Sequence, residues 1–392
     1  MELTIKQEEG LNETLTRHRN GDKYVVISGY AGTGKTTLVK FIISALDVSE
    51  DKVAYATFTG KAAEVLRKKG NKNAMTLHKL LYDSFPRPGG GFIRVPKKYL
   101  DYTIVVVDEC SMVPKTMIKM LLAHKVFVIF LGDPFQLPMI DKNESHDLLD
   151  HPHIFLDEIM RQAQESEIIR LTLKIREQKS IDFSKGEEVI IAPKEEIVTG
   201  HLLWADTIIT ATNATRHNIN KQMRELLGYE GALQPGEKII CKRNYWETCN
   251  EDGDALVNGT IGTVDNIFES FILIPNFIQN DRHRIPNIMA EFTPEGGKSF
   301  GTIDFDKDFM LSETPCVDWR TAFQIGKLRN KIGDILPKQA TYGYALTCHA
   351  AQGSEWNKVL VLEESFPFNK EEHARWLYTA CTRSAEKLVL MR

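Results

Sequence analysis

Gly29-Tyr30-Ala31-Gly32-Thr33-Gly34-Lys35-Thr36 matches the phosphate-loop pattern G-x-x-x-x-G-K-T, and the sequence on both sides supports the match. The apolar run 24–27 predicts a buried strand entering the loop, and residues 37–43 predict a helix leaving it. In this order the loop N–H groups face a β-phosphate, Lys35 reaches the β- and γ-oxygens, and Thr36 holds Mg²⁺ through its hydroxyl. The nucleotide-binding residues predicted in this segment are Gly32, Thr33, Gly34, Lys35, Thr36 and Thr37.

The composition predicts a soluble protein without a global affinity for nucleic acid. The 392 residues are enough for two or three domains, and 42% hydrophobic with 26% charged residues is ordinary for a globular chain. The formal net charge is −4, so binding to a polyanion would need a local groove. The six cysteines form no C-x-x-C pair, which favours reduced thiols over zinc or disulfides. The apolar run 126–131 is too short to cross a bilayer, and we expect a cytoplasmic location.

Polar residues follow the predicted strands where an open α/β sheet binds its ligands. Residues 53–58, 103–107 and 125–131 predict three further strands, the second apolar on both faces like a central parallel strand. Asp108 then suits the water shell of Mg²⁺, Glu109 suits a base that orients water onto a γ-phosphate, and Gln136 is placed to sense that phosphate.

Several nearby side chains have two readings. Gln7, upstream of the loop, could bind an adenine edge or lie exposed on a helix surface. Thr57 lies near the end of the strand predicted at 53–58, and Lys61 comes just after it, at the ligand-binding edge of the sheet. Thr76 and His78 mark another helix start, where a helix cap and a surface histidine are the alternatives.

Residues 83–99 break the α/β pattern and predict a small projecting hairpin with a glycine tip. An exposed aromatic side chain there could stack on bases, and we favour Phe92 over Phe85 for this role. The alternative is a phenylalanine packed beneath its own hairpin.

Together these motifs resemble superfamily 1 helicases, and most of all the RecD/Dda-like branch, superfamily 1B. The resemblance rests on Gln7, GYAGTGKT at 29–36, TFTGKAA at 57–63, TLH at 76–78, DE at 108–109 and GDPFQLP at 132–138. It implies an α/β fold of two RecA-like domains, which are parallel sheets flanked by helices, with ATP and Mg²⁺ bound between them. It also implies that Thr57, Lys61, Thr76 and His78 contact nucleic acid.

The resemblance extends to the second half of the chain. It implies that Arg161 and Arg383 are cations offered to the γ-phosphate, although a surface salt bridge is the alternative for Arg161. Thr212 and Asn213, in a T-x-N pattern, are predicted nucleic-acid contacts or helix caps. In the segment from 344 to 355 the resemblance implies that Thr347 and His349 face nucleic acid and that Gly353 and Glu355 face the nucleotide.

The predicted domains are 1–150 (1A, with hairpin 1B at 83–99), 151–235 with 337–392 (2A), and a β-barrel insertion at 236–336 (2B). The family would make 2B SH3-like. Its aromatic residues are predicted to form the barrel core, with platforms that stack on bases as the alternative: Tyr245, Trp246, Phe268, Phe271 and Phe277.

The resemblance implies an ATP-dependent DNA helicase that moves 5′→3′ by alternate closure of its two RecA-like domains. Its partners would be single-stranded and forked DNA, with a single-strand-binding protein as a further candidate, and we expect a monomer. A P-loop ATPase that remodels a protein, and an RNA translocase of the same superfamily, remain open alternatives.

Overall fold

The computed structural model describes residues 3–86, 92–139, 141, 143–276, 281–314, 336–365 and 369–392. The chain forms two compact units. Unit 1 contains Met1–Leu81, Lys97–Arg216 and Leu346–Arg392, and unit 2 contains Tyr82–Pro96 and His217–Ala345.

Unit 1 is built on two sheets, and we call the part around the first sheet the first lobe. Its strands run in the order β3-β2-β6-β7-β1-β8, and every pairing is parallel. The strands are β1 (Tyr24–Gly29), β2 (Val53–Thr57), β3 (Ala74–Thr76), β6 (Ile104–Val107), β7 (Phe127–Gly132) and β8 (Ile154–Leu156). Strands β6 and β7 are buried along their whole length, as their apolar sequences require. The predicted strand, loop and helix around the phosphate loop are confirmed.

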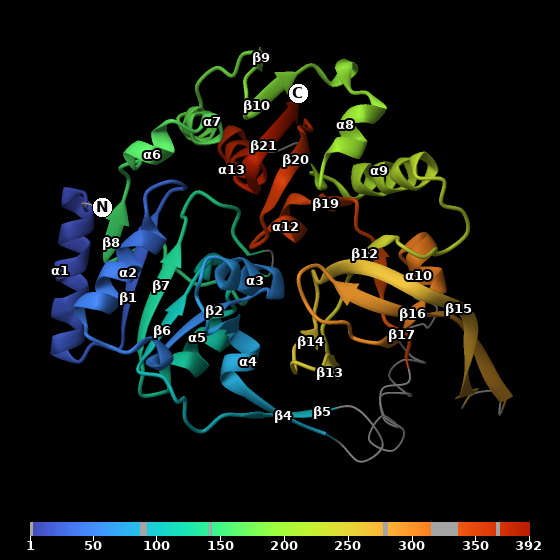
Figure 1. The fold of residues 1–392 in the computed structure, drawn as a ribbon, viewed down its shortest axis with the longest axis horizontal. Coiled ribbons are helices and arrows are strands. Elements are labelled where there is room, and N and C mark those ends of the chain that lie inside the picture. The colour runs from blue at the N-terminus through green and yellow to red at the C-terminus, as the bar shows by residue number, and fades with distance from the viewer. Residues whose placement is uncertain are drawn as a thin grey trace. The chain divides into compact units, whose positions relative to one another are not determined.

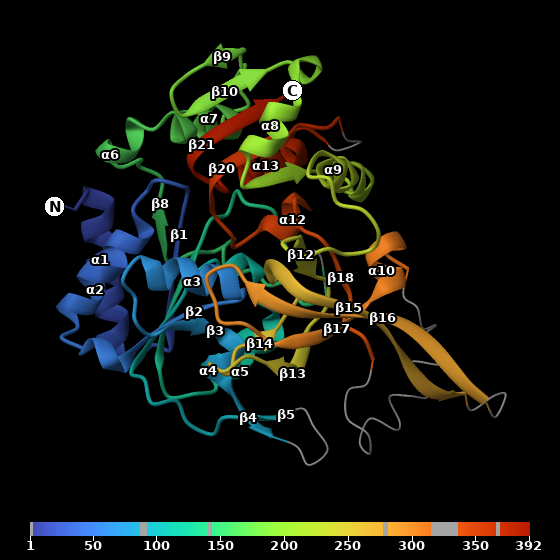
Figure 2. The same cartoon turned by 45° about the vertical axis from the view of Figure 1, so that its right-hand side comes forward.

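Helices cover this sheet and complete its core. They are α1 (Ile5–Asn20), α2 (Lys35–Ala45), α3 (Gly60–Lys68), α4 (Leu77–Leu81) and α5 (Lys115–Leu122). Helices α1 and α2 lie together beside β1 and β8 (Figures 1 and 2). Leu38 and Ile42 of α2 pack with Ile27 and Ile129 of the sheet, and Leu11 of α1 packs against the same core. This packing fixes the direction in which α2 leaves the phosphate loop.

The second lobe of unit 1 is built on a sheet with the order β19-β11-β20-β21-β10-β9. Strands β11, β20, β21 and β10 pair in parallel, and β9 is antiparallel to β10. The strands are β9 (Ser184–Lys185), β10 (Val189–Ala192), β11 (Thr207–Thr210), β19 (Ala345–Thr347), β20 (Trp356–Leu362) and β21 (Ser384–Met391). The helices are α6 (Arg161–Gln164), α7 (Glu167–Arg176), α8 (Thr199–Trp204), α12 (Cys348–Ala351) and α13 (Lys370–Cys381), and α9 (Asn213–Leu226) starts here and continues into unit 2. Parallel sheets with flanking helices confirm the α/β class.

Unit 2 is mainly antiparallel. Its largest sheet has the order β17-β16-β15-β12-β18, and two smaller sheets pair β13 with β14 and β4 with β5. The elements are β4 (Tyr82–Pro86), β5 (Phe92–Pro96), β12 (Lys238–Cys241), β13 (Tyr245–Cys249), β14 (Ala255–Leu256), β15 (Ile261–Asn276), β16 (Asp281–Pro294), β17 (Thr302–Asp306), α10 (Lys307–Ser312) and β18 (Ala340–Tyr342). Strands β15 and β16 form a long ribbon (Figure 2).

The core of unit 2 uses fewer aromatic residues than the sequence predicts. Tyr245 packs against the buried cluster around Phe292 and Phe305. Phe268 and Phe271, however, are 64% and 43% exposed, so the prediction that they belong to the core is wrong. A bulge in β15 just before Phe268 shifts the strand register, which a simple alternating pattern does not reveal. The side chains of Trp246 and Phe277 lie outside the described residues.

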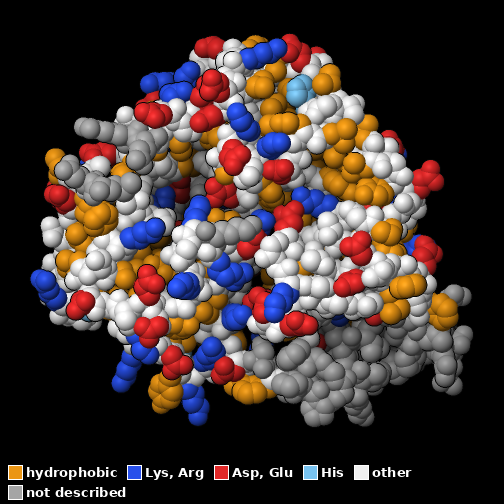
Figure 3. All heavy atoms as spheres, viewed as in Figure 1, with side chains coloured by type: hydrophobic (Ala, Val, Ile, Leu, Met, Phe, Trp, Pro, Cys, Tyr) orange, Lys and Arg blue, Asp and Glu red, His pale blue; other side chains and the backbone are white. Residues whose placement is uncertain are grey.

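The cysteines and the surface agree with the composition. Among the described residues Cys110, Cys241, Cys249, Cys348 and Cys381 are free thiols. No helix in the described part of the chain has the length and apolarity needed to cross a membrane. Basic and acidic side chains are interspersed on the face shown in Figure 3.

Candidate nucleotide site

The phosphate loop is tightly curled between β1 and α2. Gly32 and Gly34 have φ values of 78° and 77°, a left-handed conformation that favours glycine. A Cβ at Gly34 would also lie 2.5 Å from the Gln7 Nε2 atom. Lys35 folds back over the loop, where its Nζ donates to the carbonyl oxygens of Gly29 at 2.7 Å and Tyr30 at 3.0 Å.

Gln7 supports this loop from behind. It is only 1% exposed, so the alternative of an exposed surface glutamine is wrong. Its Nε2 donates to the Thr33 carbonyl at 3.1 Å, and its Oε1 accepts from Thr4 N at 3.0 Å in a capping box at the start of α1. A contact between Gln7 and adenine stays a prediction.

Two carboxylates follow β6 at the edge facing the loop. Asp108 is half-buried, and its Oδ1 accepts from Glu109 N at 2.9 Å. Burial and the neighbouring Glu109 charge raise the pKa of Asp108 to about 6, while Lys35 opposes the shift. Glu109 has a φ of 52°, a left-handed conformation that is strained for a residue with a side chain.

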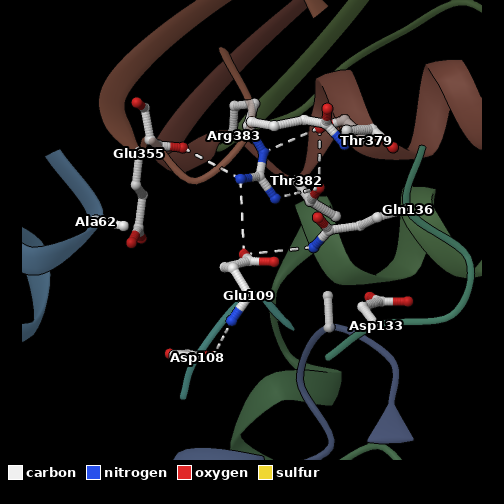
Figure 4. Close-up of polar contacts among 12 residues, drawn as sticks. Ala62, Asp108, Glu109, Asp133, Gln136, Glu355, Thr379, Thr382 and Arg383 are labelled. Atoms are coloured by element: carbon white, nitrogen blue, oxygen red, sulfur yellow. Dashed lines mark hydrogen bonds and ion pairs between the residues drawn. The ribbon is translucent and has the colours of Figure 1, made fainter. Parts of the chain in front are cut away.

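Glu109 meets one side chain from each lobe (Figure 4). Arg383 Nη1 lies 3.8 Å from Glu109 Oε1. The amide of Gln136 satisfies both neighbours when its nitrogen donates to Glu109 Oε2 at 3.1 Å and its oxygen accepts from Arg383 Nη2 at 3.2 Å. The three side chains therefore form one polar network between the lobes.

Arg383 is buried and held by several acceptors in the second lobe. Its side chain is 6% exposed, and its Nε donates to Thr379 O at 3.1 Å. Nη1 donates to Ser354 O at 3.3 Å, and Nη2 donates to Thr382 Oγ1 at 3.1 Å. These bonds direct a cation toward the carboxylate of the first lobe.

These groups line one pocket of about 300 Å³, which is in the usual range for a ligand site. Of the residues predicted from the sequence, it collects Gly32, Lys35, Thr36, Thr57, Asp108, Glu109, Gln136, Gly353, Glu355 and Arg383. Glu355 also pairs with Lys69 at 3.1 Å. Thr33, Gly34 and Thr37 belong to the same loop and helix but are not among the lining residues.

Sequence reasoning missed two second-lobe side chains that contact the phosphate loop. The Tyr378 hydroxyl accepts from Ala31 N at 2.8 Å and donates to Asp133 Oδ2 at 2.6 Å. The Arg176 guanidinium lies 3.6 Å from the centre of the Tyr30 ring. The only sequence signal for Tyr378 was its place five residues before Arg383, and Arg176 carried none.

The predicted nucleic-acid residues of the first lobe lie around the carboxyl ends of β2 and β3. Thr57 is buried and donates to Thr59 O at 2.9 Å. Lys61 lies 3.6 Å from Glu64, and the His78 ring packs 5.8 Å from Phe58. Thr76 Oγ1 accepts from Lys79 N at 3.2 Å, as the capping alternative predicted. A role in binding nucleic acid stays a prediction for all four predicted residues.

The predicted residues of the second lobe lie at two helix starts. Thr212 Oγ1 accepts from Thr215 N at 3.1 Å, and Glu364 accepts from Thr212 N at 3.0 Å, so the start of α9 is capped. Asn213 Oδ1 accepts from the buried Arg216 at 3.2 Å. Thr347 caps α12 in the same way, and burial lowers the pKa of His349.

Two predicted side chains lie outside the described residues. Arg161 starts α6 and Phe92 starts β5, but neither side chain is described. Their roles stay predictions.

Comparison with known proteins connects this site to helicases. The family model described as an AAA domain matches residues 2–190, and the model described as a UvrD-like helicase C-terminal domain matches residues 342–391. The ATP-dependent RecD2 DNA helicase of Deinococcus radiodurans is 25% identical over 97% of this chain and 49% of its own length. The ATP-dependent DNA helicase dda of Enterobacteria phage T4 is 30% identical over 37% of this chain and 34% of its own.

A solved structure shows the same fold. The Bacteroides Pif1 helicase in complex with ADP-AlF3 and ssDNA superposes with a TM-score of 0.50 at 17% identity, covering 100% of this chain and 92% of that one. The chain spans about half the length of the RecD2 relative and about a third of the phage protein. These similarities confirm the predicted resemblance to superfamily 1B helicases of the RecD/Dda-like branch.

Proposed function

We propose that this chain, a relative of the superfamily 1B helicases, is an ATP-dependent DNA helicase that moves 5′→3′ on a single strand and unwinds the duplex ahead. One observation carries the proposal: Lys35 and Glu109 of the first lobe share a pocket with Arg383 of the second. A ligand that touches both lobes is the requirement for a motor driven by closing and opening.

Binding of ATP is assigned to the phosphate loop and its neighbours. The loop N–H groups and Lys35 take the phosphates, and Gln7 supports the loop and is proposed to reach the adenine. Thr36 and Asp108 are hard oxygen donors in one pocket, and they would hold Mg²⁺, which neutralises phosphate charge when bound.

Hydrolysis is assigned to the network around Glu109. Its carboxylate would orient water, and Arg383 would stabilise charge on the γ-phosphate, with Arg161 as a second cation. Gln136 touches both Glu109 and Arg383, so we assign it the sensing of the γ-phosphate. Gly353 and Glu355 complete the nucleotide side of the pocket.

The DNA path and the domains complete the proposal. We propose domain 1A at 1–150, hairpin 1B at 83–99, domain 2A at 151–235 with 337–392, and an SH3-like 2B at 236–336. The proposed DNA contacts are Thr57, Lys61, Thr76, His78, Phe92, Thr212, Asn213, Thr347 and His349. The working unit is a monomer on single-stranded or forked DNA, and a single-strand-binding protein is a candidate partner.

ATP hydrolysis measured with and without an oligonucleotide tests the first part. Single-stranded DNA is expected to stimulate hydrolysis more than matched RNA does. Equal or greater stimulation by RNA favours an RNA translocase, and a rate unaffected by either favours an ATPase that remodels a protein.

Direction of movement is tested with duplexes that carry a single-stranded tail at one end. The chain is expected to unwind the substrate with a 5′ tail and to leave the substrate with a 3′ tail intact. Unwinding from the 3′ tail alone contradicts the proposed polarity.

A further inference from the structure

The phosphate loop is held at Ala31 by a side chain of the second lobe. The Tyr378 hydroxyl uses both of its hydrogen-bonding roles, because it accepts from Ala31 N at 2.8 Å and donates to Asp133 Oδ2 at 2.6 Å. Asp133 follows β7 in the GDPFQLP segment, and its Oδ1 accepts from Phe135 N at 2.9 Å. One hydroxyl thus joins the phosphate loop to the segment that carries Gln136.

The two side chains of this junction are buried, which limits the access of water to their hydrogen bonds. Tyr378 is 1% exposed and Asp133 is 2% exposed. The Tyr378 ring also packs edge-on against Phe135, with ring centres 5.2 Å apart. A phenylalanine at position 378 could keep this ring contact, but the Ala31 N–H and Asp133 would each lose a buried partner.

The same helix carries the arginine of the pocket. Tyr378 lies on α13, and Arg383 lies just after its end, where its Nε donates to Thr379 O. Thr379 Oγ1 in turn accepts from Leu137 N at 2.9 Å. The docking of α13 on the first lobe therefore determines both where the Tyr378 hydroxyl meets the phosphate loop and where the Arg383 guanidinium meets Glu109.

We propose that Tyr378 is a positioning residue that shapes the phosphate loop for nucleotide when α13 is docked, which links loop geometry to the approach of Arg383 to Glu109. The inference rests on the proposed function, since it takes the loop to be the ATP site. Arg176 makes a second contact of this kind, because α7 of the second lobe places its guanidinium over the Tyr30 ring. Adjacent loop residues are thus held by two different helices of the second lobe.

The test is Tyr378→Phe, which removes one oxygen and keeps the ring. Because the loop must then become ordered on binding, the KM for ATP is expected to rise about tenfold, with kcat changed less than about threefold. The dissociation constant of a fluorescent mant-ADP is expected to rise by about the same factor. Arg176→Met, which keeps an unbranched stem but removes the guanidinium, is expected to raise KM roughly two- to fivefold. Tyr55→Phe removes a partly buried tyrosine hydroxyl from β2 of the first lobe and is the control, with KM and kcat unchanged.

Each outcome bears on the inference separately from the proposed function. A fall in kcat with KM and mant-ADP affinity unchanged would show a purely structural role for Tyr378 and overturn the inference. If the wild type hydrolyses no ATP, the proposed function fails, and the ratio of mant-ADP dissociation constants alone then decides the role of Tyr378. Should Tyr378→Phe not fold, amide hydrogen exchange of the wild type decides instead: slow exchange at Ala31 supports the inference, and fast exchange contradicts it.

Discussion

Glu109 adopts a strained backbone conformation at the centre of the candidate site. Its left-handed backbone carries strain on the order of 1–3 kcal/mol, and the turn it makes leaves its carboxylate beside Gln136 and Arg383. Lys35 lies at the other side of the same pocket, with its ammonium held by two loop carbonyls. Because Lys35 and Glu109 lie on different sides of the pocket, single substitutions can test their roles separately.

Lys35→Ala is expected to reduce ATP hydrolysis by at least about 100-fold, because the loop loses the cation that meets the β- and γ-phosphates. Binding to single-stranded DNA should be largely kept, and filter binding measured beside the ATPase rate checks both. Lys40→Ala, at an exposed position of the same helix, is the control and should hydrolyse ATP normally. Retained hydrolysis in Lys35→Ala would refute the phosphate-loop assignment.

At the scale of elements, paired carboxylates join α7 to the start of β10. Glu167 Oε2 accepts from Glu188 N at 2.8 Å and Val189 N at 2.9 Å, while Glu188 Oε2 accepts from Ser166 Oγ and Glu167 N. These backbone hydrogen bonds lower the pKa of Glu167. The carboxylate form is thus favoured in the folded chain, and these hydrogen bonds hold the start of the helix against the start of the strand.

Glu167→Gln is expected to reduce the free energy of unfolding by about 1–2 kcal/mol at pH 7, because charged acceptors of backbone N–H groups are replaced by a neutral amide. A depressed folded-state pKa stabilises the fold above the unfolded value and loses that effect as the pH falls through the folded value. The difference between wild type and variant should therefore begin to shrink as the pH falls below about 4.3, the ordinary glutamate value, and vanish once the pH lies below the lowered pKa of Glu167. Urea titrations at several pH values measure it, with Glu165→Gln as the exposed control on the preceding turn.

The β4–β5 hairpin gives a second prediction at this scale. Phe92→Ala is expected to impair duplex unwinding more than translocation on a single strand, because a stacking wedge acts only at the junction. Phe85 lies on β4, the other strand of this hairpin, and is 53% exposed, so Phe85→Ala is the matched control. Equal losses of unwinding and translocation in Phe92→Ala, or no loss, would reduce Phe92 to a packing residue.

At the scale of the whole molecule, the contacts between the two lobes of unit 1 are unequal. Arg383 meets a carboxylate, whereas Arg375 on the same helix donates to the Pro134 carbonyl at 3.2 Å and stacks near Phe135. We propose that the first contact responds to a bound phosphate, whereas the second holds α13 on the first lobe.

Arg383→Ala is accordingly expected to lower DNA-stimulated hydrolysis by roughly 1,000-fold with nucleotide binding largely kept, since a cation of this kind acts on the transition state. Arg375→Ala is expected to stay within about fivefold of the wild type, because a partly exposed bond to a carbonyl contributes little. Single-turnover hydrolysis and mant-ADP titration of both variants make the comparison. Similar losses in the two variants would assign Arg383 to docking instead.

Residues in short sequence motifs could be predicted from the sequence, whereas contacts between segments far apart in the chain could not. Five predicted residues stand in recognisable local patterns and line one pocket, while their chemical roles stay predictions: Lys35, Asp108, Glu109, Gln136 and Arg383. Strand β8 is only three residues long, and Tyr378 and Arg176 act on residues far away in the chain, so no local periodicity marks them. The sequence leaves open whether Gln7 binds a ligand or is exposed, because its burial depends on contact with the phosphate loop, which forms only in the folded chain.

The buried thiols make the chain well suited to optical measurement of its own motion. Cys110, Cys241, Cys348 and Cys381 are buried, and burial raises the pKa of each thiol, so few thiolates are present for a maleimide dye at neutral pH. Replacing the half-buried Cys249, together with Cys316, would leave a background in which two engineered cysteines accept a donor and an acceptor fluorophore. Energy transfer between the lobes could then be followed through each round of turnover, with the four native thiols left in place.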